Sequence, residues 1–493
     1  MKKVILCAAA LMFGTMAFAQ VSGAPTASAV PALPGAAAGA NTGESIQNGN
    51  DNKVRVRQAG TSQSVYTNQN DGSGSGGNLA AVQQTGLVNP TSGIANLAEV
   101  LQSGSANQST TLQEGDYNNA VTRQGQNDDS SARNKAWIRQ GTGQQAESNH
   151  AAIEQDGDDN LARTQQTYDN SDAWTRQIGD GNKSMIIQNA GPNGTTGHEA
   201  MNYQEGNRNE SSINQSGAGA RNTAVAIQRA DDNQAKQLQT TTATAGSGMG
   251  NRAGITQGLA LGFSAVPVAT STWLEIINDV DGTASAISHS TQDSYGAKAK
   301  QTQHGKLQEA DIIQFGGTVG ASNYAEQEQA SGWGNEAGIA QGHYQVGDDS
   351  NYAKQYQAGD NNRAGIVQEG SGFKALQDQR GHRNKALSYQ TGEDNLLNIH
   401  QRGNDNRATS AQHGAANAAL IVQRGGHSYV AEQNMDLGQF DVSAGGNQID
   451  VLQLGPNGDF ATDGIDCDFD PPMNLDMNYN IPDLTIDDVC PDC

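Results

Sequence analysis

The sequence predicts an all-β protein, a β-solenoid built from stacked strand-turn units, and three observations lead to this class. Glutamines recur at a fixed step of 11 residues. Within each step the side chains alternate with a period of two, which is the period of a β-strand. Only 35% of the 493 residues are hydrophobic and 5% aromatic, while 60 are glycine, so the chain could hardly fill several compact cores.

The glutamine repeat is clearest in the last third of the chain. There the glutamines follow one another every 11 residues: Gln357, Gln368, Gln379, Gln390, Gln401, Gln412 and Gln423. Earlier in the chain the same step recurs in shorter runs, for example Gln155, Gln166, Gln177 and Gln188. Between the runs the step is mostly longer, and the extra residues fall in stretches rich in Gly, Asn, Asp and Ser. Such residues favour turns, so we expect insertions to lie at the corners between strands.

Each unit combines one strand with one turn. Residues two, four and six positions before each glutamine share its face in a strand of about seven residues, and the sixth is usually Asn. The turn carries a glycine two positions after the glutamine, which supplies the positive φ of a tight reversal. In the clearest stretch these positions are Asn362, Asn384, Asn395, Asn406 and Asn417, and Gly359, Gly381, Gly392, Gly403 and Gly414.

One such unit cannot bury its own face, so we expect two units per coil and two facing parallel sheets. Identical amides would then stack in ladders at about 4.7–4.8 Å per layer. The ladders satisfy polar groups whose unpaired burial would cost about 1–3 kcal/mol each. A core of glutamine and asparagine is therefore consistent with stable folding.

The chain divides into six segments on composition. Residues 1–19 are typical of an export signal, with Lys2 and Lys3 before an apolar run and cleavage expected near Ala19, so we expect the mature chain to be secreted. Residues 20–45 are expected to form a flexible leader. Repeats occupy 46–257 and 292–454, an apolar insertion 258–291, and an acidic tail 455–493.

The insertion and the tail break the repeat. The insertion contains Pro267 and several Ser and Thr residues, which favour a packed loop over a membrane span, so no transmembrane segment is expected in the mature chain. Asp466, Asp468 and Asp470 alternate in the tail without the ligand order of a known calcium motif, so a solvated tail is favoured over a metal site. Disulfides are possible among three tail cysteines: Cys467, Cys490 and Cys493.

Charge and motifs exclude several function classes. The chain has 29 basic and 52 acidic residues, a net charge of −23, which argues against a nucleic-acid partner. It lacks H-E-x-x-H and G-x-S-x-G, so no catalytic, metal or cofactor site is predicted. The Asp-rich turn at 156–159 is interpreted as a solvated corner. A β-helix polysaccharide hydrolase remains a minor alternative.

The offsets of Gln, Gly, Asn, Ala and Gln resemble the curlin repeat of the bacterial curli amyloid subunits, as in Gln401, Gly403, Asn406, Ala408 and Gln412. The resemblance spans most of residues 47–453. It implies a secreted subunit with two kinds of partner, an outer-membrane secretion pore and a nucleator subunit. It also implies extracellular fibres that serve biofilm matrix, adhesion and surface colonisation.

Self-assembly is also expected from the fold itself. A solenoid ends in two coils with unpaired main-chain groups and unfinished amide ladders, so copies can dock head to tail into a homopolymer. The acidic tail is the main candidate for a cap. The alternative is a soluble β-solenoid adhesin or ligand-binding protein that does not polymerise.

Overall fold

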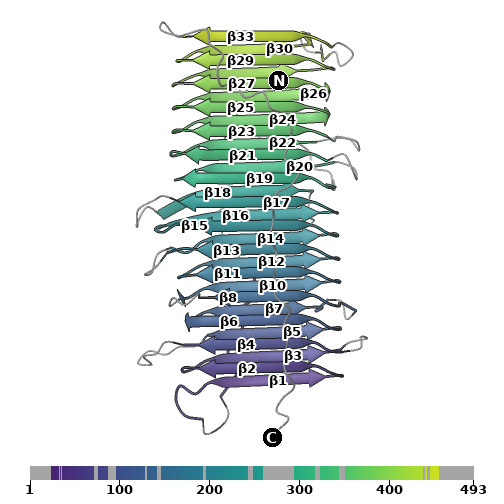
Figure 1. The fold of residues 1–493 in the computed structure, drawn as a ribbon, viewed down its shortest axis with the longest axis vertical. Coiled ribbons are helices and arrows are strands. Elements are labelled where there is room, and N and C mark those ends of the chain that lie inside the picture. The colour runs from purple at the N-terminus through teal and green to yellow at the C-terminus, as the bar shows by residue number, and fades with distance from the viewer. Residues whose placement is uncertain are drawn as a thin grey trace, which may run out of the picture. The chain divides into compact units, whose positions relative to one another are not determined.

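The computed structural model describes residues 24–32, 34, 36–71, 76–86, 96–127, 130–141, 146–191, 196–241, 248–258, 294–316, 322–342, 350–436, 439–440 and 445–454. All regular structure in these ranges is β-strand. Apart from one short antiparallel pair, the strands form two parallel sheets of stacked coils, which confirms the predicted β-solenoid (Figure 1). The expected signal, most of the insertion, and the tail with Cys467, Cys490 and Cys493 lie outside the described residues. Within those ranges we find no helix that could span a membrane.

The N-terminal unit, centred on residues 20–224, has strands that alternate between the two sheets. One sheet holds β1 (Thr42–Asn48), β3 (Ser64–Asn70), β5 (Leu97–Ser103), β7 (Asn119–Gln124), β10 (His150–Asp156), β12 (Asp172–Ile178) and β14 (Glu199–Glu205). The other holds β2 (Lys53–Ala59), β4 (Leu79–Thr85), β6 (Gln108–Asp116), β8 (Lys135–Gln140), β11 (Leu161–Thr167), β13 (Lys183–Asn189) and β15 (Glu210–Ser216), with the short β9 (Ala146–Glu147) beside β6.

The C-terminal unit is formed largely by residues 225–242 and 249–476, and β16 (Ala220–Arg229) crosses the division. One sheet holds β18 (Gly248–Gln257), β20 (Glu309–Gln314), β22 (Glu336–Gln341), β24 (Arg363–Ser371), β26 (Lys385–Glu393), β28 (Arg407–Gln412) and β30 (Ser428–Gln433). The other holds β17 (Gln234–Thr241), β19 (Lys298–Gly305), β21 (Tyr324–Ser331), β23 (Tyr352–Ala358), β25 (Lys374–Arg380), β27 (Leu396–Arg402), β29 (Ala418–Arg424) and β33 (Gln448–Leu454). A small antiparallel pair, β31 (Met435–Asp436) and β32 (Gln439–Phe440), precedes β33.

With the short β9, β31 and β32 set aside, each strand pairs with the strand two places later in the chain, so one coil contains two repeat units as predicted. The register places equivalent residues on one another: Gln379 of β25 lies beside Gln357 of β23 and Gln401 of β27. This register follows from the period of two, because a slip by one residue would turn every inward side chain to the opposite face.

The space between the sheets is filled by small and medium side chains. In the N-terminal unit, a cluster of fully buried residues consists of Ala120, Ala136, Ile138, Ala151, Ile153 and Ala162. Alanine recurs four positions before the glutamine, and Ile, Val, Thr or Ser recurs two before it. The core is therefore thin, which explains how so long a chain folds with so few aromatic residues.

The turns use left-handed backbone conformations, as the glycine spacing predicts. Gly381 has a φ of 116°, and a Cβ built there would lie 2.0 Å from the carbonyl oxygen of Gly403. Stacked glycines thus let consecutive turns approach more closely than any other residue would permit.

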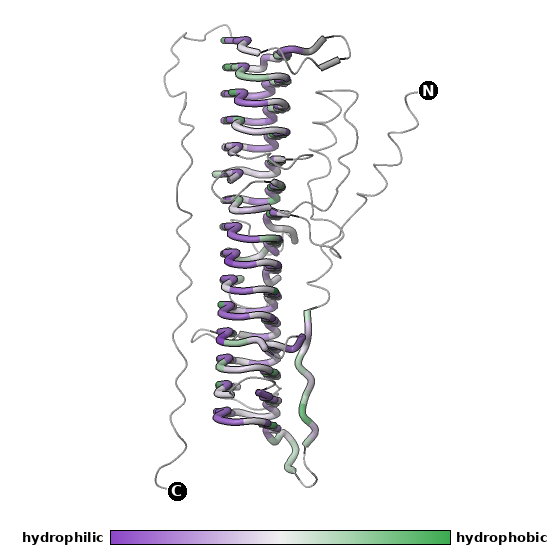
Figure 2. Tube along the Cα trace, turned by 90° about the vertical axis from the view of Figure 1, so that its right-hand side faces the viewer, coloured by the Kyte–Doolittle hydropathy of each residue, from purple (hydrophilic) through white to green (hydrophobic). Residues whose placement is uncertain are grey.

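The leader differs from the expectation of a flexible segment. The first strand begins at Thr42, inside the range 20–45. The leader runs alongside the stacked coils (Figure 2), and Ala27 packs against Val121, Ala152 and Trp174 on the outward face of the sheet that contains β7, β10 and β12. The Ala27 N–H donates to Asn119 Oδ1 at 3.0 Å, and Asn119 Nδ2 donates back to the Ala27 carbonyl at 3.1 Å. The outward residues are apolar here, so a short segment of Ala and Pro gains by covering them.

Candidate functional site

The predicted glutamine positions form two continuous ladders of side-chain amides in the C-terminal unit. Each Nε2 donates to the Oε1 of the equivalent glutamine in the next coil, at 2.8–3.0 Å. In one sheet the order is Gln357, Gln379, Gln401, Gln423 and Gln453, and in the other it is Gln368, Gln390, Gln412 and Gln433. All but the terminal Gln433 and Gln453 have an exposed fraction of 0–1%, so the ladder lies in the core.

Each glutamine also joins the two sheets, a role that the spacing of the repeat does not reveal. The second Nε2 hydrogen of Gln379 reaches the main-chain carbonyl of Arg363 at 2.9 Å, and that of Gln401 reaches Lys385 at 2.9 Å. The acceptor is the first residue of a strand in the facing sheet, 16 positions earlier. One amide therefore holds consecutive coils and opposite sheets together.

The predicted asparagines form a second ladder at the beginning of each strand. Asn384 donates through its main-chain N–H and through Nδ2 to Asn362 Oδ1, at 3.0 and 3.1 Å, and Asn406 contacts Asn384 in the same way. In the facing sheet, Asn417 donates to Asn395 at 2.9 Å.

The same asparagines fix the glycine turns. Nδ2 of Asn362 donates to the carbonyl of Gly381, that of Asn384 to Gly403, and that of Asn395 to Gly414, at 2.8–2.9 Å. Gly359, Gly381, Gly392, Gly403 and Gly414 all have positive φ. The ladder residues chosen from sequence therefore lie in shared columns, and the turn carbonyls are acceptors for the asparagine column.

The two kinds of ladder run in opposite senses. In the glutamine ladder each side chain donates to the glutamine Oε1 of the later coil. In the asparagine ladder each residue donates to the asparagine Oδ1 of the earlier coil. In the N-terminal unit the first two glutamines therefore act only as donors within the ladder. Gln47 donates to Gln69 at 2.8 Å, and Gln58 donates to Gln84 at 3.0 Å. Among the described residues, no glutamine side chain donates to Oε1 of Gln47 or Gln58.

In the last coil of the C-terminal unit the glutamines act only as acceptors within the ladder. Gln433 and Gln453 accept from the preceding coil, and their own Nε2 groups donate only to main-chain carbonyls within the described residues. The inward side chains of β33 are half-buried, and those at the N-terminal end are half-buried or exposed, with Val56 36% exposed. The first coil of the N-terminal unit thus presents ladder acceptors, and the last coil of the C-terminal unit presents ladder donors.

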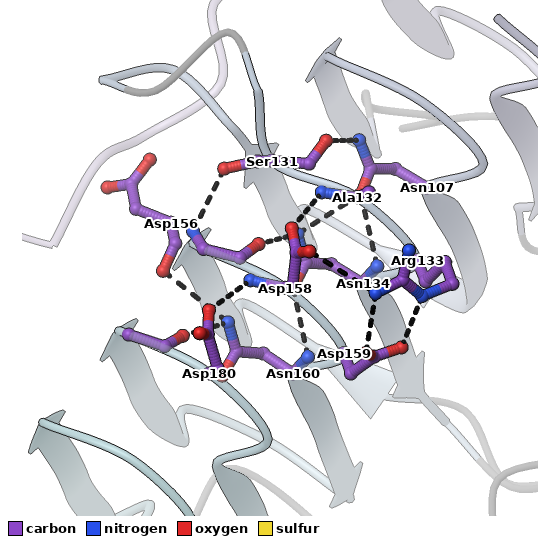
Figure 3. A network of polar contacts seen from close by, with 12 residues as sticks. Asn107, Ser131, Ala132, Arg133, Asn134, Asp156, Asp158, Asp159, Asn160 and Asp180 are labelled. Atoms are coloured by element: carbon purple, nitrogen blue, oxygen red, sulfur yellow. Dashed lines mark hydrogen bonds and ion pairs between the residues drawn. The ribbon is translucent and has the colours of Figure 1, made fainter. Parts of the chain in front are cut away.

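The Asp-rich turn at 156–159 is part of the stack (Figure 3), with Asp159 exposed and Asp156 and Asp158 half-buried. Asp158 accepts from the N–H of Ala132 at 2.8 Å, and Asp180 accepts from the N–H of Asp158 at 2.8 Å. Arg133 forms a two-pronged ion pair with Asp159, both contacts at 2.7 Å, and this hydrogen bonding holds the pKa of Asp159 below its usual value. These carboxylates thus link neighbouring coils.

Two other carboxylates bear on the hydrolase alternative. Asp172 and Glu199 are register neighbours on β12 and β14, and burial raises the pKa of both. Glu199 is 3% exposed and forms an ion pair with Arg221, while Asp172 lies 3.9 Å from His150. Glu199 is thus buried and Asp172 half-buried, each next to a basic side chain. In the described ranges, no three His, Cys, Asp or Glu side chains gather as metal ligands.

No protein-family model matches the chain, and no curated protein matches it either.

Proposed function

We propose that this chain is a secreted structural subunit that polymerises head to tail into extracellular fibres, in the manner of curlins. The observation that carries the proposal is the complementarity of the two end coils. Gln47 and Gln58 offer Oε1 acceptors at the first coil, and Gln433 and Gln453 offer Nε2 donors at the last.

Main-chain groups support the same mode of docking. The terminal strands in the order of the two sheets are β1 and β2 in the N-terminal unit and β30 and β33 in the C-terminal unit. An edge strand presents a row of N–H and C=O groups that can pair with another chain. A second copy stacked in register would continue both the sheets and the ladders, and repeated contact of this heterologous type extends into a filament.

The proposed biological role comes from the resemblance of the repeat to curlins. It comprises biofilm matrix, adhesion and surface colonisation, with export through an outer-membrane pore and seeding by a nucleator subunit. The apolar run before Ala19 supports secretion.

Negative-stain electron microscopy of residues 20–493, imaged over hours after dilution from denaturant, tests the proposal. We expect long unbranched filaments whose growth is accelerated by preformed seeds. Particles that stay single at every concentration would contradict it and would favour the non-polymerising adhesin. Filament stability in sodium dodecyl sulfate would separate ordered stacking from loose aggregation.

A further inference from the structure

The outward face of one sheet in the C-terminal unit is buried. Five outward side chains on β25, β27 and β29 are at most 5% exposed: Leu376, Asp378, Asn398, His400 and Val422. Side chains alternate between the two faces of a strand, so a strand with one solvated face shows alternating burial. In β25 and β27 only the end residues escape burial, and the alternation is lost.

An equivalent strand of the N-terminal unit, β13, shows the ordinary pattern. Its outward residues Met185 and Ile187 are half-buried, and its inward residues are buried. Met185 stands three positions before its glutamine, as Leu376 does, and Ile187 stands one position before it, as Val422 does. The burial of the outward face on β25, β27 and β29 is therefore not a general property of the coil, and it requires a further layer of atoms over that face.

The described strands of the C-terminal unit do not supply this layer. All of them belong to the two stacked sheets, apart from the short pair of β31 and β32. The described leader residue Ala27 packs against β7, β10 and β12, in the N-terminal unit. The covering layer is therefore sought among the residues outside the described ranges.

Two buried polar atoms on this face indicate the chemistry of the layer. Nδ1 of His400 lies 3.8 Å from Oδ2 of Asp378, whereas its Nε2 has no hydrogen-bond partner among the described residues. Nε of Arg424, on the next strand, is also buried without such a partner. Buried polar groups are nearly always hydrogen-bonded in native proteins. A covering polypeptide offers the missing partners through its main chain and its carboxylates, and an apolar layer would not.

We propose that the start of the acidic tail, residues 455–476, binds along the outward face of β25, β27 and β29 of the same chain. The tail follows Leu454, the last residue of β33, and β33 pairs with β29 in this sheet. Adjacent strands are about 4.8 Å apart, so β25 lies about 14 Å from β33, a distance that about five extended residues span. The insertion at 258–291, in contrast, follows β18 of the facing sheet.

The composition of residues 455–476 is complementary to this face. The segment has six Asp and no Lys or Arg, with apolar residues between them: Phe460, Ile465, Phe469, Met473 and Leu475. The outward positions of β25, β27 and β29 have four cations and one carboxylate, Asp378, which Arg380 contacts at 3.0 Å. Opposite net charges favour the contact, and apolar side chains of the tail gain by packing against Leu376 and Val422.

The contact is independent of the proposed fibre, since it uses an outward face and not the end coils. It also differs from the cap and from the solvated tail that composition suggests. The proposal leaves the two terminal coils open and places the tail on the side of the stack.

Carbodiimide cross-linking tests the position of the tail, because the reagent joins a carboxylate to a lysine amine only where the two are in contact. The sample is the mature chain, residues 20–493, freshly diluted and checked by sedimentation to be unassembled. Lys374 is exposed at the beginning of β25, so we expect a cross-link between Lys374 and an Asp of residues 455–476. A mixture of unlabelled and isotope-labelled chains separates links within a chain from links between chains. Tail links only to other lysines, links only between chains, or no tail links would each overturn the proposal.

The reactivity of Cys467 gives a second measurement. Cys490→Ser with Cys493→Ser leaves Cys467 as the single cysteine of the mature chain. We expect its reaction with a thiol reagent to be at least about fivefold slower in the chain than in a free peptide of residues 455–493 with the same two changes. Equal rates in chain and peptide would overturn the proposal.

The face variant is Leu376→Glu with Val422→Glu, which should raise the Cys467 rate to that of the peptide. The matched control is Met185→Glu with Ile187→Glu, at the same offsets on β13, and it should leave Cys467 protected. Circular dichroism verifies that each variant folds. Protection that survives in the face variant would place the tail elsewhere, and equal loss in both variants would show that the protection is not specific to this face; either result overturns the proposal.

Discussion

The Nε2 of Gln379 donates to Oε1 of Gln401 at 2.8 Å, one coil farther along the chain. The same nitrogen donates to the Arg363 carbonyl of the facing sheet at 2.9 Å. A single buried amide thus completes both of its donor contacts inside the protein. The loss of such a side chain would leave buried carbonyl groups without their partners.

The first prediction concerns this ladder. Replacing Gln379, Gln390 and Gln401 together by leucine should lower the free energy of unfolding by at least about 3 kcal/mol and slow or abolish assembly, because each change orphans buried polar groups at about 1–3 kcal/mol each. Urea unfolding and thioflavin fluorescence measure the two effects. Arg407→Ala is the control, since its exposed side chain faces outward and should leave both unchanged. Similar losses in the two variants would show that the inward and outward faces are misassigned.

A second prediction compares two glycines of one turn column. Gly381→Ala should destabilise the fold by about 2–3 kcal/mol, because φ is 116° and the new Cβ would strike the Gly403 carbonyl. Gly403→Ala should cost only about 1 kcal/mol, because its nearest atom, the Gly425 nitrogen, lies 3.4 Å away. Equilibrium denaturation would reveal the difference, and equal costs would refute the close stacking of turns.

A third prediction follows from His198, which occupies the asparagine position of its repeat. Its Nδ1 accepts from the Asn222 N–H at 3.3 Å, Nε2 lies 3.2 Å from the Asn189 carbonyl, and burial lowers its pKa from 6.5 to about 4. The unfolded chain therefore takes up a proton below about pH 6.5 that the folded state resists until about pH 4. Stability should fall across this window as pH falls, by about 3 kcal/mol in total.

The variant His198→Asn should remove that part of the pH dependence, because it restores the asparagine of the column and carries no titratable group. Urea midpoints at about pH 7, 5.5 and 4.5, which bracket the histidine window, provide the measurement. A profile as steep as that of the wild type would show that other groups cause the loss.

A fourth prediction tests the leader. Ala27→Asp places a charge against Trp174, Val121 and Ala152, so residues 24–32 should detach and Trp174 fluorescence should shift to the red. The ladders are not involved, so stability should fall by less than about 1 kcal/mol. Ser28→Asp is exposed and should leave the spectrum unchanged. Identical spectra for both variants would mean that the leader does not shield Trp174.

A fifth prediction concerns the end coil. Val56 points inward on β2 and is 36% exposed because it lies at the end of the stack. Val56→Lys should block docking at this end, so that small amounts added to the wild type cap growing filaments and slow elongation. Arg57→Ala, on the outward face of the same strand, is the control. Normal elongation with Val56→Lys present would exclude docking through the first coil.

Much of the fold could be predicted from sequence because the repeat is local and regular. The spacing of Gln379, Asn384 and Gly381 was sufficient to place them in columns, since a strand permits only two faces and the turn requires a positive φ. The packing of Ala27 beside Asn119 could not be predicted, because the two are 92 residues apart and no periodic pattern links them.

The hydrogen bond from Gln379 to the Arg363 carbonyl could not be predicted from the sequence for a different reason. It depends on the distance between the facing sheets and not on residue type. The register neighbours Arg363, Lys385 and Arg407, on β24, β26 and β28, did have a signal in the sequence. The three cations are 22 residues apart, which is one full coil, but a search for charges close together in sequence does not find them.

The opposite senses of the two ladders have an electrostatic consequence. The side-chain carbonyls of the glutamine column point toward earlier coils, and those of the asparagine column point toward later ones. Aligned amides would otherwise sum to a macroscopic dipole, as they do along a helix. The two columns oppose each other, so their fields offset one another. The offset is smaller across β17, β19, β21, β23 and β25, where a second glutamine column runs in the same sense as the first, so a layer added there meets a stronger net field.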